Sequence, residues 1–356
     1  MKKIFIGKRE ISDRKRPLVI GEISANHNNS LETVYKLLLA AKKINLEFVK
    51  LQTFDVDEMT LNLRKGDFLI KQKFSNKKWN NRSLYDIYKE AHLPFDWHYK
   101  IFKKAKKLGV GIFSSVFDLK SLDLLEKLGC PAYKIASLES LHFPLIKAVT
   151  KTRKPLLIST GTLSIKEIDG LIKFLRSLKF KNYILLHCIT NYPTKIEDTN
   201  LKTISYIKNK YKCLVGFSDH TSDTICANAA IANGANIIEK HYKLTKKDKG
   251  LDAQFSLDPK TMKKLIDETH KTWMSIGELK SDTLKNEIIY KKYRRSIYIC
   301  KDVKKNQLIN LSNVKVIRPG KGIEPKYLPK IIGKRFNKNL KSGTPLQLKF
   351  LKNFNV

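Results

Sequence analysis

Short runs of β-branched and other apolar residues recur along the chain, and each run stops on a polar residue before a helical pattern begins. Eight runs are found: 18–24, 48–53, 111–116, 132–137, 156–161, 183–188, 215–220 and 237–242. A parallel strand that is buried on both faces has this near-continuous apolar character. Between the runs, as in 164–178 and 259–277, Leu and Ile recur at the spacing of a helix with one buried face. The alternation predicts an α/β fold with a closed (β/α)8 (TIM) barrel.

The polar residues that end these runs are the first candidates for a functional site. In a (β/α)8 barrel the chemistry lies at the C-terminal ends of the strands. The residues in such positions are Glu22, Lys50, Gln52, Ser115, Lys134, Ser137, Ser159, His220 and His241.

The connection after the second run is unusually long. Residues 54–95 span more than forty positions and contain a helical pattern at 83–91, whereas about two to six residues are typical for such a loop. Long loops at the catalytic end of a barrel shape the pocket or cover it. We therefore interpret 54–95 as an element that decides specificity.

The pattern also predicts domain boundaries. Residues 1–16 are expected to form an N-terminal β-hairpin, 17–280 the barrel, and 281–295 a charged linker. Residues 296–356 alternate in short strands with Asn, Pro and Gly turns, which predicts a small strand-rich domain. So small a domain has a marginal core, so we expect it to dock on the barrel or on a partner subunit.

Two kinds of chemistry are indicated at the strand ends. His220 and His241 end neighbouring strands, and Glu22 ends the next one, so they predict a divalent-metal site that suits Mn, Zn or Fe. Lys50 and Lys134 supply positive charge for a phosphate or carboxylate, or one of them is a Schiff-base nucleophile. Hydroxyl groups are expected around the two lysines. The lysines and hydroxyls together predict a binding site for a small, multiply charged anion such as a phosphorylated carboxylate. The hydroxyls come from Ser115, Ser137, Ser159, Thr190 and Ser218.

Composition adds little to this interpretation. The formal net charge is +37, but the basic residues are mostly Lys and are spread along the whole chain, which favours a solvated exterior over a nucleic-acid or membrane interface. The five cysteines include no CxxC pair, and the N-terminal apolar stretch is too short for a signal peptide. No run is long enough to span a membrane. We expect a cytoplasmic protein with reduced thiols.

Several motifs together resemble the sialic acid synthase family. They are GEISANHN (21–28), KLQT (50–53), FSSVFD (113–118), YKIAS (133–137), GFSDHT (216–221), EKHY (239–242) and DAQFSLDP (252–259), and IRPGKGI (317–323) resembles the family's antifreeze-like (SAF) C-terminal domain. The resemblance covers essentially the whole chain. It implies a metal-dependent condensation of phosphoenolpyruvate (PEP) with an N-acetylated aldose, which gives a nine-carbon 2-keto acid.

The resemblance also implies roles for individual residues. PEP is expected on Lys50, Ser115, Lys134, Ser137, Ser159, Thr190 and Ser218. The sugar is expected to face Gln52, Tyr192, Asp252 and Arg318, the last supplied by the C-terminal domain of the partner in a domain-swapped homodimer. His220 and His241 are expected to bind the metal, Mn²⁺ with Mg²⁺ or Co²⁺ as alternatives, and either Glu22 or Glu139 to transfer a proton.

Within the family, SANHN (24–28) and the loop at 59–98 are most similar to the pseudaminic acid synthases. Their aldose is 2,4-diacetamido-2,4,6-trideoxy-L-altrose. One alternative is a sialic or legionaminic acid synthase, which acts on N-acetylmannosamine or its 2,4-diacetamido analogue. A more distant alternative is a basic anion- or nucleic-acid-binding protein on an inactive barrel, against which the presence of both lysines, both histidines and Glu22 speaks.

Overall fold

The computed structural model describes residues 2–71 and 78–352, and these residues form two compact units that divide after Gly277. In the first unit eight parallel strands close into a barrel in the order β10-β3-β4-β5-β6-β7-β8-β9. The strands are β3 (Leu18–Glu22), β4 (Phe48–Thr53), β5 (Gly111–Val116), β6 (Tyr133–Ile135), β7 (Leu156–Ser159), β8 (Tyr183–Cys188), β9 (Leu214–Asp219) and β10 (Ile237–His241). The predicted (β/α)8 barrel is therefore confirmed.

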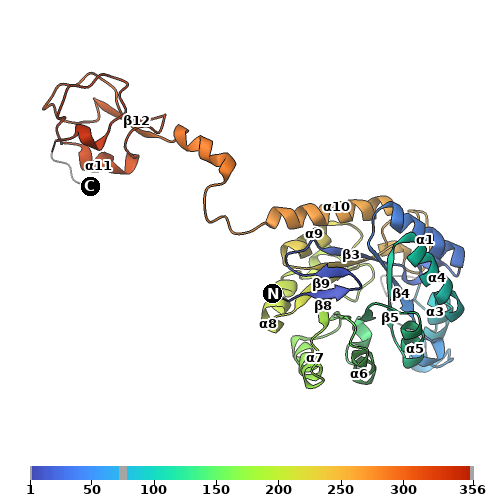
Figure 1. Ribbon diagram of the computed structural model, residues 1–356. Coiled ribbons are helices and arrows are strands. Elements are labelled where there is room, and N and C mark those ends of the chain that lie inside the picture. Colours follow the sequence, from blue (N-terminus) through green and yellow to red (C-terminus); the bar gives the residue numbers. More distant parts are fainter. Residues whose placement is uncertain (1, 72–77, 353–356) are drawn as a thin grey trace. The chain divides into compact units, whose positions relative to one another are not determined.

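A helix follows every barrel strand and packs on the outside of the barrel (Figure 1). These helices are α1 (Leu31–Lys43), α4 (Phe95–Leu108), α5 (Leu119–Lys127), α6 (Phe143–Lys151), α7 (Ile165–Ser177), α8 (Lys202–Tyr211), α9 (Ile225–Ala232) and α10 (Pro259–Ile276). Four of them, α1, α5, α7 and α10, begin at a residue whose side chain accepts a backbone N–H group. Ser164, for example, forms a capping box with Glu167 at the start of α7.

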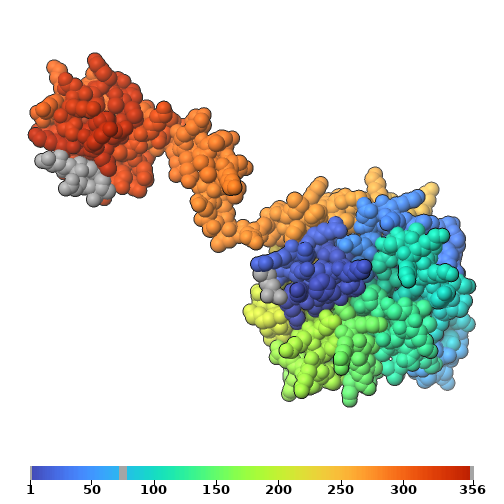
Figure 2. Space-filling view, viewed as in Figure 1, coloured from blue at the N-terminus to red at the C-terminus, as the bar shows by residue number. Residues whose placement is uncertain are grey.

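The barrel unit begins with a segment that lies outside the barrel strands. An antiparallel hairpin, β1 (Ile4–Ile6) and β2 (Arg9–Ile11), precedes the barrel. Ile4, Ile6 and Ile11 join the barrel core, and the following Asp13 accepts hydrogen bonds from Asn236 and Lys208. This N-terminal segment, dark blue in Figure 2, forms part of the outer surface of the unit. Because Asn236 directly precedes β10, the segment contacts the strands at the end opposite their C-terminal edge.

The long connection after β4 folds into short helices rather than an open loop. They are α2 (Val56–Met59), the 3₁₀ helix η2 (Gly66–Phe68) and α3 (Leu84–Ala91). Ser83 caps α3 by accepting the N–H of Asp86, and His27 contacts the Ala91 carbonyl at 3.1 Å. His27 lies in η1 (Ser24–His27), the short 3₁₀ helix that follows β3. The connection is thereby fastened to the C-terminal edge of the barrel.

Similar short 3₁₀ helices follow other strands: η3 (Ser137–Glu139), η4 (Ile196–Thr199) and η5 (Ala253–Phe255). The second unit contains η6 (Lys285–Tyr293), β11 (Ser296–Ile299), β12 (Val314–Ile317), η7 (Pro325–Tyr327), α11 (Leu328–Ile331) and η8 (Leu348–Phe350). β11 and β12 pair antiparallel. The second unit has a hydrophobic core of its own, which includes Ile297, Val314 and Phe336. None of the described helices is long and apolar enough to cross a membrane.

One fully buried ion pair lies on the outer face of the barrel, between strands and helices. Lys240 on β10 is 2.9 Å from Asp219 on β9, and both side chains are 0% exposed. Lys240 also donates to the Thr221 carbonyl at 2.5 Å, and Asp219 accepts the N–H of Thr221 at 2.8 Å. A buried charge is tolerated only when it is paired and hydrogen-bonded, so this pair ties β9 to β10.

The variant Asp219→Ala is expected to lower the free energy of unfolding by about 3–5 kcal/mol, because it leaves the Lys240 ammonium buried without its partner. Urea unfolding followed by tryptophan fluorescence measures this, since Trp79, Trp97 and Trp273 all lie in the barrel unit. The control is Lys263→Ala, which removes the exposed pair with Asp267 and should cost less than about 1 kcal/mol. Equal losses in the two variants would contradict a structural role for the buried pair.

Candidate functional site

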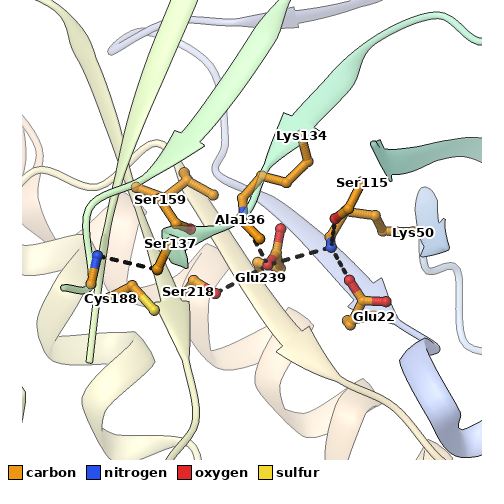
Figure 3. A network of polar contacts seen from close by, with 12 residues as sticks. Glu22, Lys50, Ser115, Lys134, Ala136, Ser137, Ser159, Cys188, Ser218 and Glu239 are labelled. Atoms are coloured by element: carbon orange, nitrogen blue, oxygen red, sulfur yellow. Dashed lines mark hydrogen bonds and ion pairs between the residues drawn. The ribbon is translucent and has the colours of Figure 1, made fainter. Parts of the chain in front are cut away.

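A network of buried charges lies inside the barrel at the C-terminal ends of β3, β4, β6 and β10 (Figure 3). The register of the sheet sets Glu22 beside Lys50 and Ser115 beside Lys134. Lys50 forms an ion pair with Glu22 and donates to Ser115 Oγ at 2.7 Å. Both lysine side chains are no more than 3% exposed. Four of the residues at the predicted strand ends, Glu22, Lys50, Ser115 and Lys134, thus lie next to one another.

Glu239 joins the two lysines and was not among the residues singled out from the sequence. Its Oε1 lies 3.7 Å from Lys50 Nζ and 3.5 Å from Lys134 Nζ, and it accepts from Ser218 Oγ at 3.0 Å. Side chains two residues apart on a strand share a face. Glu239 precedes His241 by two positions, so the alternation along this strand predicts that it faces the barrel interior together with His241.

The carboxylates govern the charge of the lysines. Burial by itself would lower the pKa of Lys50, but Glu22 and Glu239 outweigh it and hold that pKa above its ordinary value. Burial lowers the pKa of Lys134, and the Glu239 carboxylate opposes this shift. The Lys50 ammonium is therefore a fixed positive charge in a dry environment, where its attraction for an anion is strong.

A second group of polar atoms lies next to the lysines, around Gly161. A Cβ atom at position 161 would lie 2.3 Å from Thr190 Oγ1 and 2.6 Å from Ser137 Oγ, so any side chain there would displace these hydroxyls. The Gly161 N–H donates to Ser137 Oγ at 3.1 Å. Ser159 Oγ and Thr190 Oγ1 are buried and have no hydrogen-bond partner within residues 2–71 and 78–352. Buried hydroxyls normally have partners, so these two suit an anion with several acceptor oxygens.

Two imidazoles lie side by side at the neighbouring strand ends. The ring centres of His220 and His241 are 5.5 Å apart. His220 Nδ1 lies 2.9 Å from the Ile189 carbonyl, which can only accept, so in the neutral ring Nε2 is the nitrogen with the free lone pair. Burial lowers the pKa of His220, but Cys188, whose Sγ lies 3.9 Å from Nδ1, outweighs it and raises that pKa. His241 Nδ1 is buried, has no hydrogen-bond partner in the described chain, and lies 3.7 Å from Asp252 Oδ2.

The imidazole pair fits a divalent metal by its chemistry. Burial holds the pKa of His241 well below its ordinary value, so its ring stays neutral, as metal coordination requires. Two imidazole nitrogens suit ions such as Mn, Fe or Zn. Among the described residues no cluster of three or more His, Cys, Asp and Glu could hold a metal ion. Glu22, which the sequence suggested as a neighbour of such a site, is engaged by Lys50 and the Ser24 N–H instead.

A cavity of about 400 Å³ adjoins the hydroxyls around Gly161 and the imidazole pair. Ser137 and Thr190 belong both to the hydroxyl group and to the cavity lining, so the anion site and the cavity are continuous. The cavity is also lined by Gln52, Glu139, Tyr192, His241 and Asp252. Tyr192 packs against His220 with ring centres 4.2 Å apart, which gives this side of the cavity an aromatic surface.

Glu139 is the carboxyl group of the cavity with the clearest capacity for proton transfer. It follows β6 in η3, and burial raises its pKa to about 7 against the opposing effects of a backbone hydrogen bond and of Lys134. Its Oε2 atom is buried and has no hydrogen-bond partner in the part of the chain that the structure describes. A carboxyl group with a pKa near the working pH can both accept and release a proton.

Arg318 is the one predicted site residue in the other unit. It is exposed and directly follows β12 (Val314–Ile317). The two units are separate compact bodies, so its place at the cavity stays a prediction.

Known proteins share this combination of barrel and small domain. The NeuB family model matches residues 37–281, and the SAF domain model matches residues 294–352. The pseudaminic acid synthase of Campylobacter jejuni is 36% identical over 333 residues, which are 94% of this chain and 96% of that protein. The N,N'-diacetyllegionaminic acid synthase of the same species is 32% identical and covers 92% of this chain and 98% of its own length.

A solved structure agrees with these sequence relatives. The N-acetylneuraminic acid synthetase of Leptospira borgpetersenii, in complex with citrate, superposes with a TM-score of 0.71 at 27% identity. The match covers 81% of this chain and 94% of that one. The family resemblance inferred from the motifs is thereby confirmed. The chain belongs to the NeuB family and carries a SAF domain at its C-terminal end.

Proposed function

We propose that the protein is a pseudaminic acid synthase. It condenses PEP with 2,4-diacetamido-2,4,6-trideoxy-L-altrose and water to give a nine-carbon 2-keto acid and inorganic phosphate. The observation that carries the reaction type is the buried pair Lys50 and Lys134 beside the hydroxyls around Gly161, continuous with a cavity that two imidazoles adjoin. Such a site has one part for a phosphorylated carboxylate and another for an uncharged second substrate.

The choice of sugar rests on similarity. The Campylobacter jejuni pseudaminic acid synthase shares 36% of residues with this chain, against 32% for the legionaminic acid synthase of that species. Both cover more than nine tenths of the chain. The second candidate function is therefore that of a legionaminic or sialic acid synthase, which performs the same chemistry on another aldose.

Most of the predicted roles are consistent with the geometry. Lys50 and Lys134 bind the phosphate and carboxylate of PEP, with hydroxyl donors around them. Ser115 contacts Lys50, and Ser218 contacts Glu239, so both serines lie at the edge of the charged network. From there their hydroxyls bind PEP. The remaining hydroxyls come from Ser137, Ser159 and Thr190. The contribution of all these residues is largely to position PEP.

The sugar occupies the cavity, with its aldehyde end toward Gln52, Tyr192 and Asp252. His220 and His241 hold a divalent metal, for which we propose Mn²⁺. When bound, this ion polarises the aldehyde as a Lewis acid. Mg²⁺ or Co²⁺ are the alternatives.

The chemical step forms one carbon–carbon bond and breaks one carbon–oxygen bond. C3 of PEP bonds to C1 of the aldose, water supplies its oxygen to C2 of PEP, and phosphate leaves with cleavage of its bond to C2. We assign the proton of that water to Glu139, because its pKa of about 7 and its unpartnered Oε2 suit a base. Glu22 keeps Lys50 in place and charged.

The SAF domain completes the site from the partner subunit in a domain-swapped homodimer, with Arg318 on the sugar. The support is that Arg318 is exposed at the end of a strand, in a unit that is compact by itself.

The function is tested by phosphate release from PEP with three aldoses, namely the trideoxy-altrose, its 2,4-diacetamido mannose-type analogue and N-acetylmannosamine. The first should give the highest kcat/KM. EDTA should abolish turnover and Mn²⁺ should restore it, because the imidazole pair needs its ion. Turnover with N-acetylmannosamine alone would favour the second candidate. Salt-dependent DNA binding with no turnover would favour a binding protein on an inactive barrel.

The role of Glu139 predicts a pH dependence. A base must be ionised, so kcat should rise as pH increases through about 7 and then level off. Glu139→Gln should lower kcat by about 10²–10⁴-fold and remove that rising limb. Glu22→Gln is the comparison: it should weaken PEP binding and leave the limb in place. A limb that survives in Glu139→Gln would assign the proton to another group.

The swapped arrangement predicts that two defective variants repair each other. Arg318→Ala should raise the KM for the sugar more than that for PEP. Mixing it with Glu139→Gln should restore activity with an ordinary sugar KM, because a mixed dimer has one intact barrel facing one intact Arg318. If each SAF domain serves its own barrel, no mixed site is intact and mixing restores nothing.

A further inference from the structure

The segments that line the cavity differ in chemistry. Its polar groups, among them Gln52, Glu139, Asp252 and His241, come from segments at the barrel strand ends, which also contribute apolar side chains such as Leu138. The side contributed by the long connection after β4 consists of apolar and aromatic side chains. We call this side the apolar wall, and it comprises Met59, Ile70, Trp79, Leu84, Ile87 and Tyr88.

The apolar wall is a built part of the fold. Ile70 and Ile87 pack with Ala25 and Leu251 in one buried cluster, against which Trp79 and Leu84 lie. Ala25 belongs to η1, directly after β3, so the cluster joins the wall to the strand ends. The wall therefore has a defined position at the strand ends, where Trp79 packs against Tyr192 with ring centres 5.4 Å apart, and a ligand in the cavity meets apolar side chains next to polar ones.

A sugar that fills the cavity must place some of its carbon atoms against Met59, Leu84 and their neighbours. A hydroxyl there loses its water, and the aliphatic side chains of the wall offer no donor or acceptor in exchange. A methyl group in the same place gains from leaving water.

We propose that the apolar wall makes the enzyme selective for aldoses that lack the C6 oxygen, with the C6 methyl group packed against Met59 and Leu84. This inference rests on the proposed function and assigns its sugar specificity to named residues. A single hydroxyl against an apolar wall changes kcat/KM by roughly 10- to 100-fold. Selection of this kind acts mainly on the sugar and leaves PEP binding unchanged.

The test compares two aldoses that differ only in the C6 oxygen, with kcat/KM measured for each. The wild-type protein should prefer the 6-deoxy sugar by roughly 10- to 100-fold. Met59→Gln and Leu84→Asn place a polar group of similar size in the wall and should each reduce the preference several-fold. The matched controls Met59→Leu and Leu84→Met keep the wall apolar and should preserve it. The KM for PEP should stay the same in all four variants.

A wild-type protein that does not distinguish the two sugars would overturn the proposal, as would polar variants that keep the full preference. The pair is made on whichever N-acetylated aldose the enzyme accepts, so the comparison remains valid if that aldose is mannose-type. Failure of the trideoxy-altrose as a substrate would contradict the proposed function alone. An unchanged ratio in the polar variants would contradict the apolar wall alone.

Discussion

The buried network of Lys50, Glu22, Glu239 and Lys134 is the interaction on which the rest of the site depends. Two ammonium groups in a dry barrel interior would be prohibitively costly without carboxylates beside them. Four different strands supply the four residues, so the network exists only when the barrel has closed in the correct register. The same charges that must be balanced for folding are those that attract an anionic substrate. The same four side chains therefore contribute to the stability of the barrel and to substrate binding.

Around this network the site is divided by polarity. Hydroxyls near Gly161 continue the anion site, the imidazoles of His220 and His241 adjoin it, and the cavity extends from there toward the connection after β4. The barrel strands supply the polar groups, and the connection supplies the apolar wall. A family that keeps its reaction while changing its sugar can do so by altering the connection, because no residue of the charged network lies in it. Within this fold, the residues that determine the reaction type and those that determine the substrate therefore lie in different segments of the chain.

Much of the fold was predictable from the sequence for a simple physical reason. Strands buried on both faces must be apolar throughout, so all eight were visible as runs, and their polar ends marked Glu22, Lys50, Lys134, His220 and His241. Glu239 escaped notice because it lies inside a run rather than at its end. The helical segment 83–91 was also visible, but nothing in the sequence indicated that its Leu84 and Ile87 would face the same cavity as Gln52.

The sequence by itself determined the barrel, the family and the types of residue at the site, because periodicity and motif spacing are local properties of the chain. Only the tertiary structure decided which of these residues meet. It paired Glu22 with Lys50 rather than with the imidazoles, left Glu139 buried with a raised pKa, and brought an apolar wall into the same cavity as the polar strand-end residues. Each of these depends on burial and on contacts between residues far apart in the chain. Those quantities come into existence only when the strands close into a barrel.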